Sequence, residues 1–587
     1  MEIKVRVEAL RGKMRKEGVD AYLITGSDPH ASEYVPARWQ TRSWISGFTG
    51  SAGTVVVTQN EALLWVDSRY YIQGEQEIAN TPFTLQKQGM EAVVDPAEWL
   101  GENLPSKSVV AVDRESFTLA AQRKLLEELK PRGLILEERE DWFDEIWPDR
   151  PPIPFSKVTA LPTAVAGLSV GEKIEIIRKV MSEKGWSDTI ISSLDDIAWV
   201  LNLRGEDVPY NPVFLSYLLI GMEKVVLFTN PKRLEKGLLD EVVSVAPYEE
   251  IFSFVKEYFS PSSILYFSPD RTNLALIGAL PETLKRVEGR DISTQLKSRK
   301  GERELEGMRQ AHRADGIAMV KFLALIDSNQ KRYTELTLAD ELEHCRQESS
   351  DYLGPSFSTI AGFKEHGALA HYSASEESSV ELVGDGLLVL DSGGQYKSGT
   401  TDITRTLLFG EPSEEMIVDY TLVLKGNLAL TRQQFPAQTA GYQLDALARQ
   451  FLWQAGLNYG HGTGHGVGFC LNVHEGPQSI SPRPIAVALE EGMVISNEPG
   501  IYREESHGVR LENLVAVVKG ELSEMGQFYR FEVLTLAPFE RRLIATHLLT
   551  EEEREQLNAY HDWVYEELQG ELNEVERSWL RQATLPL

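Results

Sequence analysis

The sequence predicts an α/β (α+β) protein in which two similar N-terminal α/β domains precede a third domain of different character. Residues 19–24 and 187–191 are short strand patterns, each followed closely by serine or aspartate. Each continues through a glycine-containing loop into further apolar strands, at 54–57 and 215–220. Alternating strand and helix patterns are typical of α/β domains. The third part begins with amphipathic helices and continues with strands whose ends carry carboxylates and histidines.

Two features divide the chain into predicted domains at residues 1–150, 155–296 and 297–587. Residues 147–154 contain four prolines, which neither a helix nor a central strand accommodates. Residues 297–303 are mostly charged and lead into a predicted helix. Its spacing puts these apolar residues on one face: Leu305, Met308, Ala311, Ile317, Val320 and Leu323.

The C-terminal tail is predicted to be helical. Thr550 and Glu553 have the spacing of a capping box. The apolar residues that follow mark one helix face: Leu557, Tyr560, Val564 and Leu568. That face must pack either on the third domain itself or on a second subunit.

The composition argues against a nucleic-acid or membrane partner. Among 587 residues, 59 Lys and Arg stand against 88 Asp and Glu, and the net charge of −29 repels phosphate backbones and anionic membranes. Two cysteines, Cys345 and Cys470, specify no disulfide framework. The sequence also suggests neither a secretory signal nor a membrane span. We therefore expect a cytoplasmic protein.

A first pair of carboxylates follows an apolar strand pattern. Residues 387–390 lead into Asp391, the chain turns through glycines, and it returns through Asp402. A hairpin of that size can place both carboxylates on neighbouring strands. Two carboxylates in contact repel unless a cation or proton joins them. The alternative is that Asp391 only initiates a turn and Asp402 is solvated.

Histidines accumulate in a glycine-rich segment. His461 and His465 are four residues apart, but the glycines around them make a zinc-binding helix implausible. The glycines instead let extended backbone pass close to a metal or substrate. His474 follows nine residues later and His371 lies upstream. A lone histidine is usually structural, but such a cluster favours a functional site.

Two further carboxylates complete the set. Glu498 follows an apolar strand pattern, and residues 509–514 alternate so that Arg510 and Glu512 face one way. Together the sequence offers two Asp, one His and two Glu: Asp391, Asp402, His465, Glu498 and Glu512. Four carboxylates can neutralise two divalent ions, and oxygen-rich ligation favours hard to borderline metals. Five ligands also leave positions open for water and substrate.

These segments resemble the pita-bread metallopeptidases of family M24. The strings at 391–406 and 459–477 are similar to the long, three-domain Xaa-Pro aminopeptidases (aminopeptidase P). The resemblance extends through 45–53, 67–70 and 197–205, and therefore covers essentially the whole chain. It implies two creatinase-like α/β domains followed by a pita-bread catalytic domain. Ile501 and the Phe469-Cys470 pair depart from the family pattern and could reshape the pocket.

The resemblance also implies an activity and a set of roles. It implies hydrolysis of the N-terminal Xaa-Pro bond of peptides by a hydroxide that two divalent ions activate. The ion that it implies is Mn²⁺, with Co²⁺, Fe²⁺ or Zn²⁺ as alternatives. It also implies that the protein is a homodimer. Asp391 binds one ion, His465 and Glu498 bind the other, and Asp402 and Glu512 bridge both. The remaining roles are substrate binding by Arg69, substrate binding and proton transfer by His371, His461 and His474, ligand orientation by Arg510, and proton return by Glu498 or His474.

Two other functions are compatible with the same fold. One is a metal-free hydrolase such as creatinase, and the other is a peptide- or protein-binding module without catalysis. Both predict the loss of several of the five ligands, whereas this sequence retains all five. We therefore expect a metalloaminopeptidase.

Overall fold

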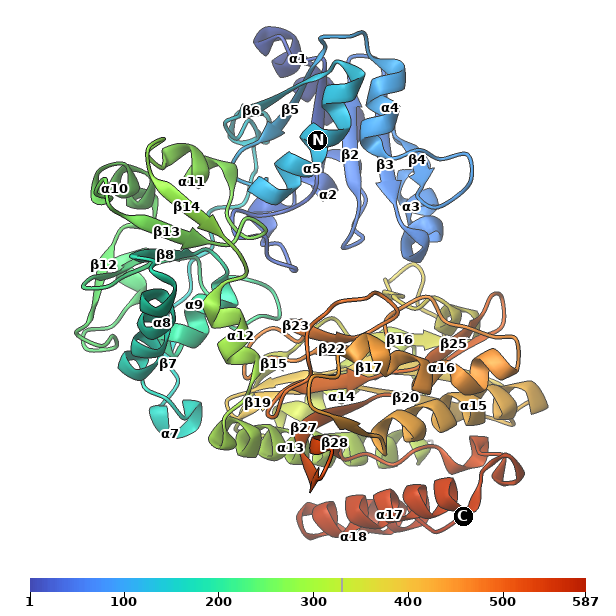
Figure 1. Cartoon of the computed structure of the whole chain (residues 1–587). Helices are drawn as coiled ribbons and strands as arrows, with labels where there is room; N and C mark the ends of the chain where they lie inside the picture. The colour runs from blue at the N-terminus through green and yellow to red at the C-terminus, as the bar shows by residue number, and fades with distance from the viewer. Residues whose placement is uncertain (329–330) are drawn as a thin grey trace. The chain divides into compact units, whose positions relative to one another are not determined.

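The computed structural model describes residues 1–328 and 331–587. The chain forms two compact units, which Figure 1 shows in blue to green and in green to red. The first unit comprises residues 1–160, 169–209 and 213–293, and the second comprises residues 161–168, 210–212 and 294–587. Each unit is described by itself below.

The first unit contains two sheets of the same plan, with strand orders β4-β3-β2-β1-β5-β6 and β12-β11-β10-β8-β13-β14. In each sheet, the second and third pairings in the order given are antiparallel, and the other three pairings are parallel. This repetition confirms the predicted pair of similar α/β segments. The strand bounds are β1 (Ala21–Ile24), β2 (Thr54–Thr58), β3 (Ala62–Val66), β4 (Thr84–Lys87), β5 (Val109–Asp113), β6 (Ile135–Arg139), β8 (Asp188–Ile191), β10 (Tyr217–Gly221), β11 (Val225–Phe228), β12 (Val243–Ala246), β13 (Ile264–Phe267) and β14 (Lys285–Glu288), with a small pair β7 (Thr159–Ala160) and β9 (Leu203–Arg204).

Helices flank both sheets of the first unit. One hydrophobic cluster includes Val56 and Leu125 from the first sheet region and Leu219 and Leu276 from the second, so the two sheet regions share apolar packing. The helix bounds are α1 (Ile3–Glu17), α2 (Thr41–Ser46), α3 (Tyr71–Ile78), α4 (Pro96–Asn103), α5 (Leu119–Leu129), α6 (Phe143–Ile146), α8 (Val170–Lys184), α9 (Leu194–Leu201), α10 (Ile251–Tyr258) and α11 (Leu274–Ala279). Helix α12 (Ile292–Ser298) spans the start of the second unit.

The second unit is built on antiparallel strands. Its sheets have the orders β21-β28-β27-β24-β22-β23, β16-β17-β20, β15-β18-β19 and β25-β26. Side chains from the first two of these sheets contribute to separate hydrophobic clusters, with Val515 in one and Leu388 in another. The bounds are β15 (Tyr352–Pro355), β16 (Ile360–Phe363), β17 (Gly386–Ser392), β18 (Gly394–Tyr396), β19 (Gly399–Thr400), β20 (Ile403–Phe409), β21 (Gln434–Pro436), β22 (Gly464–Gly466), β23 (Glu475–Ile480), β24 (Val494–Asn497), β25 (Gly500–Arg503), β26 (His507–Arg510), β27 (Asn513–Ser523) and β28 (Gly526–Val533).

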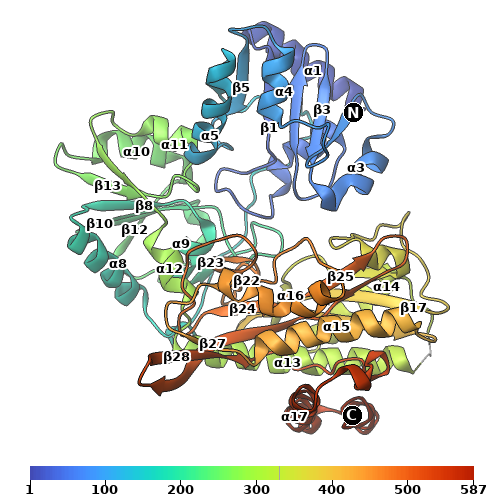
Figure 2. The same cartoon turned by 45° about the vertical axis from the view of Figure 1, so that its right-hand side comes forward.

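Helices cover the strands of the second unit, and Figure 2 shows α13 and α15 running along them. The helix predicted after residue 303 is confirmed as α13, with Met308, Ala311 and Val320 fully buried. The bounds are α7 (Thr163–Ala166), α13 (Glu302–Asp327), α14 (Glu335–Gln347), α15 (Glu414–Thr431), α16 (Asp445–Gln454), α17 (Glu551–Leu568) and α18 (Glu574–Ala583).

The C-terminal tail packs on its own unit. Thr550 and Glu553 form the predicted capping box of α17. Leu557 joins a cluster with Leu424 on α15, and Val564 joins one with Val320 on α13. The sequence left two partners for this apolar face, the third domain or a second subunit. In the structure the face packs on helices of the third domain.

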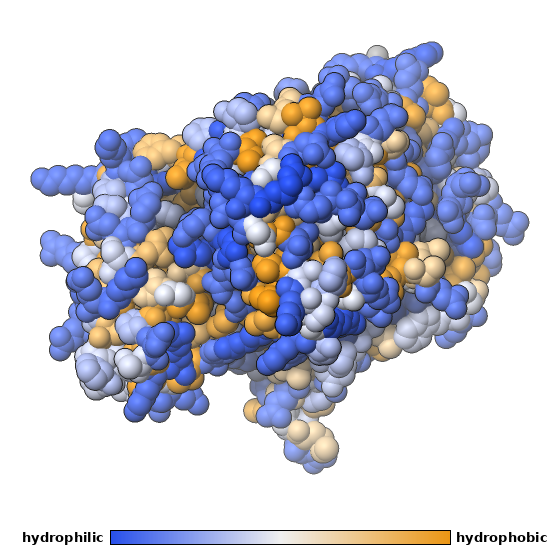
Figure 3. All heavy atoms as spheres, turned by 90° about the horizontal axis from the view of Figure 1, so that it is seen from above, coloured by the Kyte–Doolittle hydropathy of each residue, from blue (hydrophilic) through white to orange (hydrophobic). Residues whose placement is uncertain are grey.

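Hydrophilic side chains cover most of the face shown in Figure 3. This distribution agrees with the net charge of −29. Within the described parts of the chain, no helix has both the length and the apolar character that crossing a membrane requires.

Candidate active site

The first two carboxylates lie on two neighbouring strands of the β16-β17-β20 sheet. Asp391 is near the end of β17, and Asp402 directly precedes β20. The register pairs Asp391 with Thr404, so Asp402 lies diagonally from Asp391 and not opposite it. The connection is longer than the predicted simple hairpin because β18 and β19 leave for another sheet. Both carboxylates are largely buried, which excludes the solvated alternative for Asp402.

The glycine-rich segment forms the short extended strand β22, as its composition predicts. A Cβ atom at Gly464 would lie 1.9 Å from the Ser496 carbonyl oxygen, and one at Gly466 would lie 2.3 Å from that of Glu475. The glycines therefore permit close contact with β24 and β23. This packing sets His465 beside Glu498, which directly follows β24.

The orientation of His465 suits a metal ligand. Its Nδ1 lies 3.0 Å from the Gly466 carbonyl oxygen, to which it donates as Nδ1–H, so that Nε2 carries the lone pair when the ring is neutral. Nε2 faces Asp402 Oδ2 at 3.4 Å and Glu498 Oε1 at 3.5 Å. Ser496 holds both neighbours, since its Oγ accepts from the His465 N–H at 2.9 Å and donates to Glu498 Oε1 at 3.1 Å.

Glu512 completes the cluster from the segment between β26 and β27. Ligand atoms of Asp402, His465 and Glu512 all lie within 4.8 Å of one another. The Thr404 hydroxyl donates to Glu512 Oε2 at 2.9 Å. Arg510 and Glu512 face the site while Leu511 is buried in an apolar cluster, as the predicted alternation requires.

The donor set fits divalent cations. Among the described residues, one buried carboxylate oxygen each of Asp391, Asp402 and Glu512 has no hydrogen-bond partner. Burial, with the charge of Asp402, raises the pKa of Asp391 and Glu512. Burial with nearby carboxylates also raises the pKa of Glu498 to about 7. Such a cluster is costly without a cation to join it.

His465 shows the same demand for positive charge. Burial alone would lower its pKa, but the hydrogen bond to Asp402 and the charges of Glu498 and Asp402 outweigh burial and raise that pKa to about 9. At neutral pH this raised pKa keeps a proton on His465 Nε2, which is the position where a divalent ion would bind.

A second layer joins Asp391 to His461. Arg510 donates from Nη2 to Asp391 Oδ2 at 2.8 Å and from Nη1 to the Tyr502 hydroxyl at 2.7 Å. The same hydroxyl lies 2.8 Å from His461 Nε2, and His461 Nδ1 lies 2.7 Å from the Gly462 carbonyl oxygen. Burial and the charge of Arg510 lower the pKa of His461 to about 3, so this imidazole is neutral at pH 7.

The other predicted substrate residues lie in different settings. The rings of His474 and His465 have centroids 4.3 Å apart. His371 is exposed and lies close enough for its charge to act on His461. Arg69 lies in the first unit, where it pairs with Asp67 at 2.7 Å, and its predicted role in substrate binding stays a prediction.

The structure places the two departures from the family pattern in buried positions. Ile501 packs in an apolar cluster with Val509 and Tyr420, because β25 points it away from the site. Its neighbour Tyr502, which the sequence reading missed, points toward the site instead. Cys470 is 1% exposed, within the buried segment that also contains Phe469, and the effect of this pair on the pocket stays a prediction. The period-2 alternation around β25 was the signal that could have identified Tyr502.

Family models match four consecutive parts of the chain. Residues 306–519 match metallopeptidase family M24, and residues 527–587 match the C-terminal region of that family. Residues 6–137 and 149–304 each match a creatinase/prolidase N-terminal domain.

Full-length relatives extend this match. A protein of Botryotinia fuckeliana named probable Xaa-Pro aminopeptidase P is 40% identical, across 99% of this chain and 92% of its own length. Xaa-Pro aminopeptidase 1 of Dictyostelium discoideum is 35% identical, across 100% and 97%. The chain belongs to the Xaa-Pro aminopeptidases of metallopeptidase family M24. The predicted family and enzyme class, a metal-dependent hydrolase, are thereby confirmed.

A solved structure of this M24 family has the same fold over its full length. The X-prolyl aminopeptidase of Caenorhabditis elegans, described as a cytosolic enzyme with a di-nuclear active site, superposes with a TM-score of 0.93 at 35% identity. The superposition covers 100% of both chains. The prolidase of Pyrococcus horikoshii is more distant, with a TM-score of 0.52 at 25% identity over 64% of this chain. The predicted fold, creatinase-like domains followed by an M24 catalytic domain, is confirmed.

Proposed function

We propose that this M24 peptidase releases the first amino acid from peptides whose second residue is proline, using two divalent ions. The observation that carries the proposal is the convergence of Asp391, Asp402, His465, Glu498 and Glu512, with unpartnered buried oxygens on three of them among the described residues. Metal-free hydrolysis and a purely binding function both leave this concentration of buried negative charge unexplained.

The proposal takes its ligand roles from the family resemblance. Asp391 would hold one ion, His465 with Glu498 would hold the other, and Asp402 and Glu512 would be shared between them. When bound, two divalent ions activate water and polarise the scissile carbonyl. The excess of carboxylate over imidazole ligands favours Mn²⁺ over softer metals. Return of activity to chelator-treated protein, compared across Mn²⁺, Co²⁺, Fe²⁺ and Zn²⁺, tests that choice.

The neutral His461 is suited to positioning. Its low pKa keeps it from donating as an imidazolium at pH 7. Its Nε2 therefore accepts a hydrogen bond from the Tyr502 hydroxyl, and it presents a ring face to the substrate. His474, beside His465, and Glu498 are the two proposed groups for returning a proton to the departing nitrogen. His371 and Arg69 complete the proposed substrate contacts.

Proline at the second position is favoured by the chemistry of the bond. The Xaa-Pro nitrogen has no N–H, so the site need not accept a hydrogen bond there. The experiment compares an Arg-Pro-Pro peptide with its Ala-second and N-acetylated versions and follows the released amino acid. Release of arginine from the first alone supports the proposal. Equal cleavage of the Ala-second peptide contradicts proline specificity, and cleavage of the acetylated peptide contradicts aminopeptidase action.

The setting is proposed to be a cytoplasmic homodimer with peptide substrates and neither nucleic acid nor membrane as partner. The cytosolic relative from Caenorhabditis elegans supports the compartment. The strongly acidic composition argues against nucleic-acid and membrane partners. The domain bounds 1–150, 155–296 and 297–587 are kept as part of this proposal. Sedimentation equilibrium of the purified protein tests the dimer, and a single monomeric species contradicts it.

A further inference from the structure

One buried amide contacts the backbone behind both glutamates of the site. Asn427 lies on α15 and is 1% exposed. Its Nδ2 donates to the carbonyl oxygen of Asn497 at 2.9 Å and to that of Leu511 at 3.1 Å. These two residues directly precede Glu498 and Glu512. Both hydrogens of one amide are therefore used to hold the two chain segments that carry the glutamates.

The contact is reciprocal. The side chain of Asn497 donates back to the Asn427 carbonyl oxygen at 2.9 Å and to Thr431 Oγ1 at 3.0 Å. Because the peptide group is planar, fixing the carbonyl of one residue also fixes the direction in which the next residue leaves. The last turns of α15 thus fix the backbone positions from which the Glu498 and Glu512 side chains extend.

We propose that Asn427 is a positioning residue of the metal site, which fixes the spacing between the Glu498 and Glu512 carboxylates. The inference rests on the proposed function, in which both are metal ligands. Asn427 does not touch the ions or the peptide in this proposal. It acts through the backbone, as groups outside the ligands of a metal commonly do.

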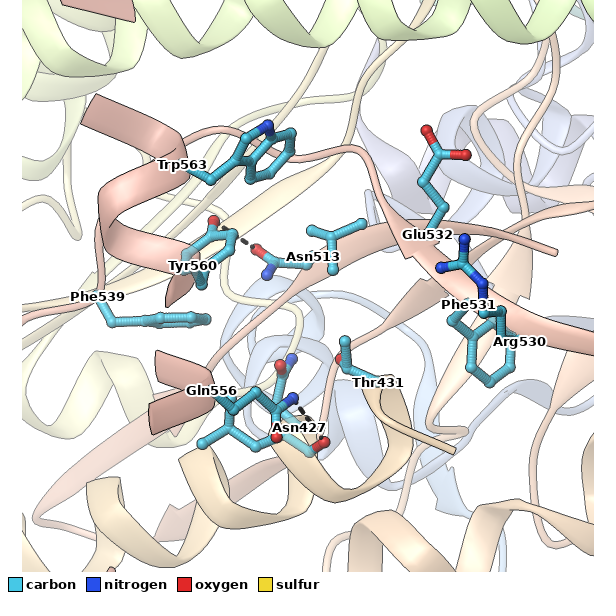
Figure 4. A pocket seen from close by; sticks show the side chains of 12 residues that line it. Asn427, Thr431, Asn513, Arg530, Phe531, Glu532, Phe539, Gln556, Tyr560 and Trp563 are labelled. Carbon is cyan, nitrogen blue, oxygen red and sulfur yellow. Dashed lines mark hydrogen bonds between the residues drawn. The ribbon is translucent and has the colours of Figure 1, made fainter. Parts of the chain in front are cut away.

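A cavity on the other side of Asn427 makes the position sensitive to substitution. The cavity has a volume of about 390 Å³, and Asn427 shares its wall with Gln556 and Tyr560 of α17 (Figure 4). With open space behind it, a changed side chain can turn away from the two carbonyls. Gln556 offers a matched control, since its amide donates to the Leu428 carbonyl oxygen at 3.1 Å and lies in the same cavity.

The test uses the full chain, stripped of metal and titrated with Mn²⁺ by calorimetry. Asn427→Asp keeps the shape but replaces the double donor, and Asn427→Ser leaves one short donor. Gln556→Glu makes the same chemical change in the same cavity without touching residue 497 or 511. We expect Mn²⁺ affinity to fall roughly 10–100-fold in Asn427→Asp and less in Asn427→Ser, with Gln556→Glu close to wild type. Thermal midpoints of the metal-free proteins are recorded beside each titration.

Wild-type Mn²⁺ affinity in Asn427→Ser, together with a lowered metal-free midpoint, overturns the proposal and leaves Asn427 a stability residue. A Glu512→Ala protein is titrated in the same series. Full metal binding by Glu512→Ala contradicts the ligand assignment itself. Loss of metal in Glu512→Ala with unchanged affinity in both Asn427 variants contradicts only the positioning role.

Discussion

Arg510 and Asp391 form a buried ion pair, with Nη2 and Oδ2 2.8 Å apart and side chains 4% and 12% exposed. The same guanidinium donates to Tyr502, which contacts His461. One cation therefore orients a proposed metal ligand and a proposed substrate residue together. The planar guanidinium donates hydrogen bonds in two fixed directions at once, which the ammonium group of a lysine does not reproduce.

Substituting Arg510 should damage both functions. In Arg510→Lys we expect kcat/KM to fall about 100-fold and Mn²⁺ affinity to fall roughly 10-fold, because Asp391 loses its aligned partner. Steady-state kinetics and metal titration on one preparation measure this. The exposed Arg530→Lys serves as the control. Unchanged metal affinity in Arg510→Lys would show that Asp391 needs no orientation.

The proposed bridging ligands should be required for metal, and His461 for turnover. Asp402→Ala and Glu512→Ala should lose at least one ion per chain, because the remaining carboxylates cannot hold both. His461→Ala should keep both ions and lose about 100-fold in kcat, within the usual range for a positioned imidazole. Elemental analysis and kcat on the same samples decide this. Two bound ions per chain in Asp402→Ala would contradict the assignment of Asp402 as a metal ligand.

Tyr502→Phe isolates the link between Arg510 and His461. Loss of a hydroxyl bonded to a charged group costs about 1.5–3 kcal/mol, so kcat/KM should fall about 10–100-fold with both ions retained. The partly exposed Tyr442→Phe should behave as wild type. Metal loss in Tyr502→Phe would instead show that the hydroxyl acts mainly by orienting Asp391 through Arg510.

The first unit should lose stability as pH rises toward neutrality. Burial and the charge of Asp141 raise the pKa of Asp113 to about 7, above the unfolded value of about 3.9. The folded state thus binds the extra proton, and its stabilising contribution falls between about pH 4 and pH 7. The loss should be on the order of 1–3 kcal/mol, because part of the side chain stays exposed.

Thermal unfolding of wild type and Asp113→Asn across that pH range measures the effect. The amide cannot ionise, so its midpoint should fall less steeply with pH. An exposed substitution, Asp149→Asn, should leave the wild-type slope. Parallel curves for wild type and Asp113→Asn would contradict the prediction.

Local pattern was sufficient to place several elements and the strand ends that carry proposed ligands. The apolar spacing from Leu305 predicted α13, and strand ends predicted where Asp391 and Glu498 lie. Burial of one face of a helix or strand imposes these periodicities, so they are visible in the short stretch of sequence that forms the element. Residue roles beyond placement stay predictions until the variants are measured.

What escaped prediction depends on contacts between distant segments. Asn427 meets residues 70 and 84 positions away, and Arg405 donates to the Glu512 carbonyl 107 positions away. Neither residue type is unusual for its own helix or strand. Only the packing of α15 and β20 against the glutamate-bearing segments gives these side chains a function, and no local periodicity encodes that packing.

The cavity behind Asn427 bears on inhibitor design. At about 390 Å³ it falls within the size range of small-molecule pockets, and its wall combines aromatic rings with amides. A compound bound there would contact Asn427, and none of the five proposed metal ligands lines this cavity. It would need no chelating group, so it would not cross-react with unrelated metalloenzymes through their metals. Inhibition would then be non-competitive with peptide.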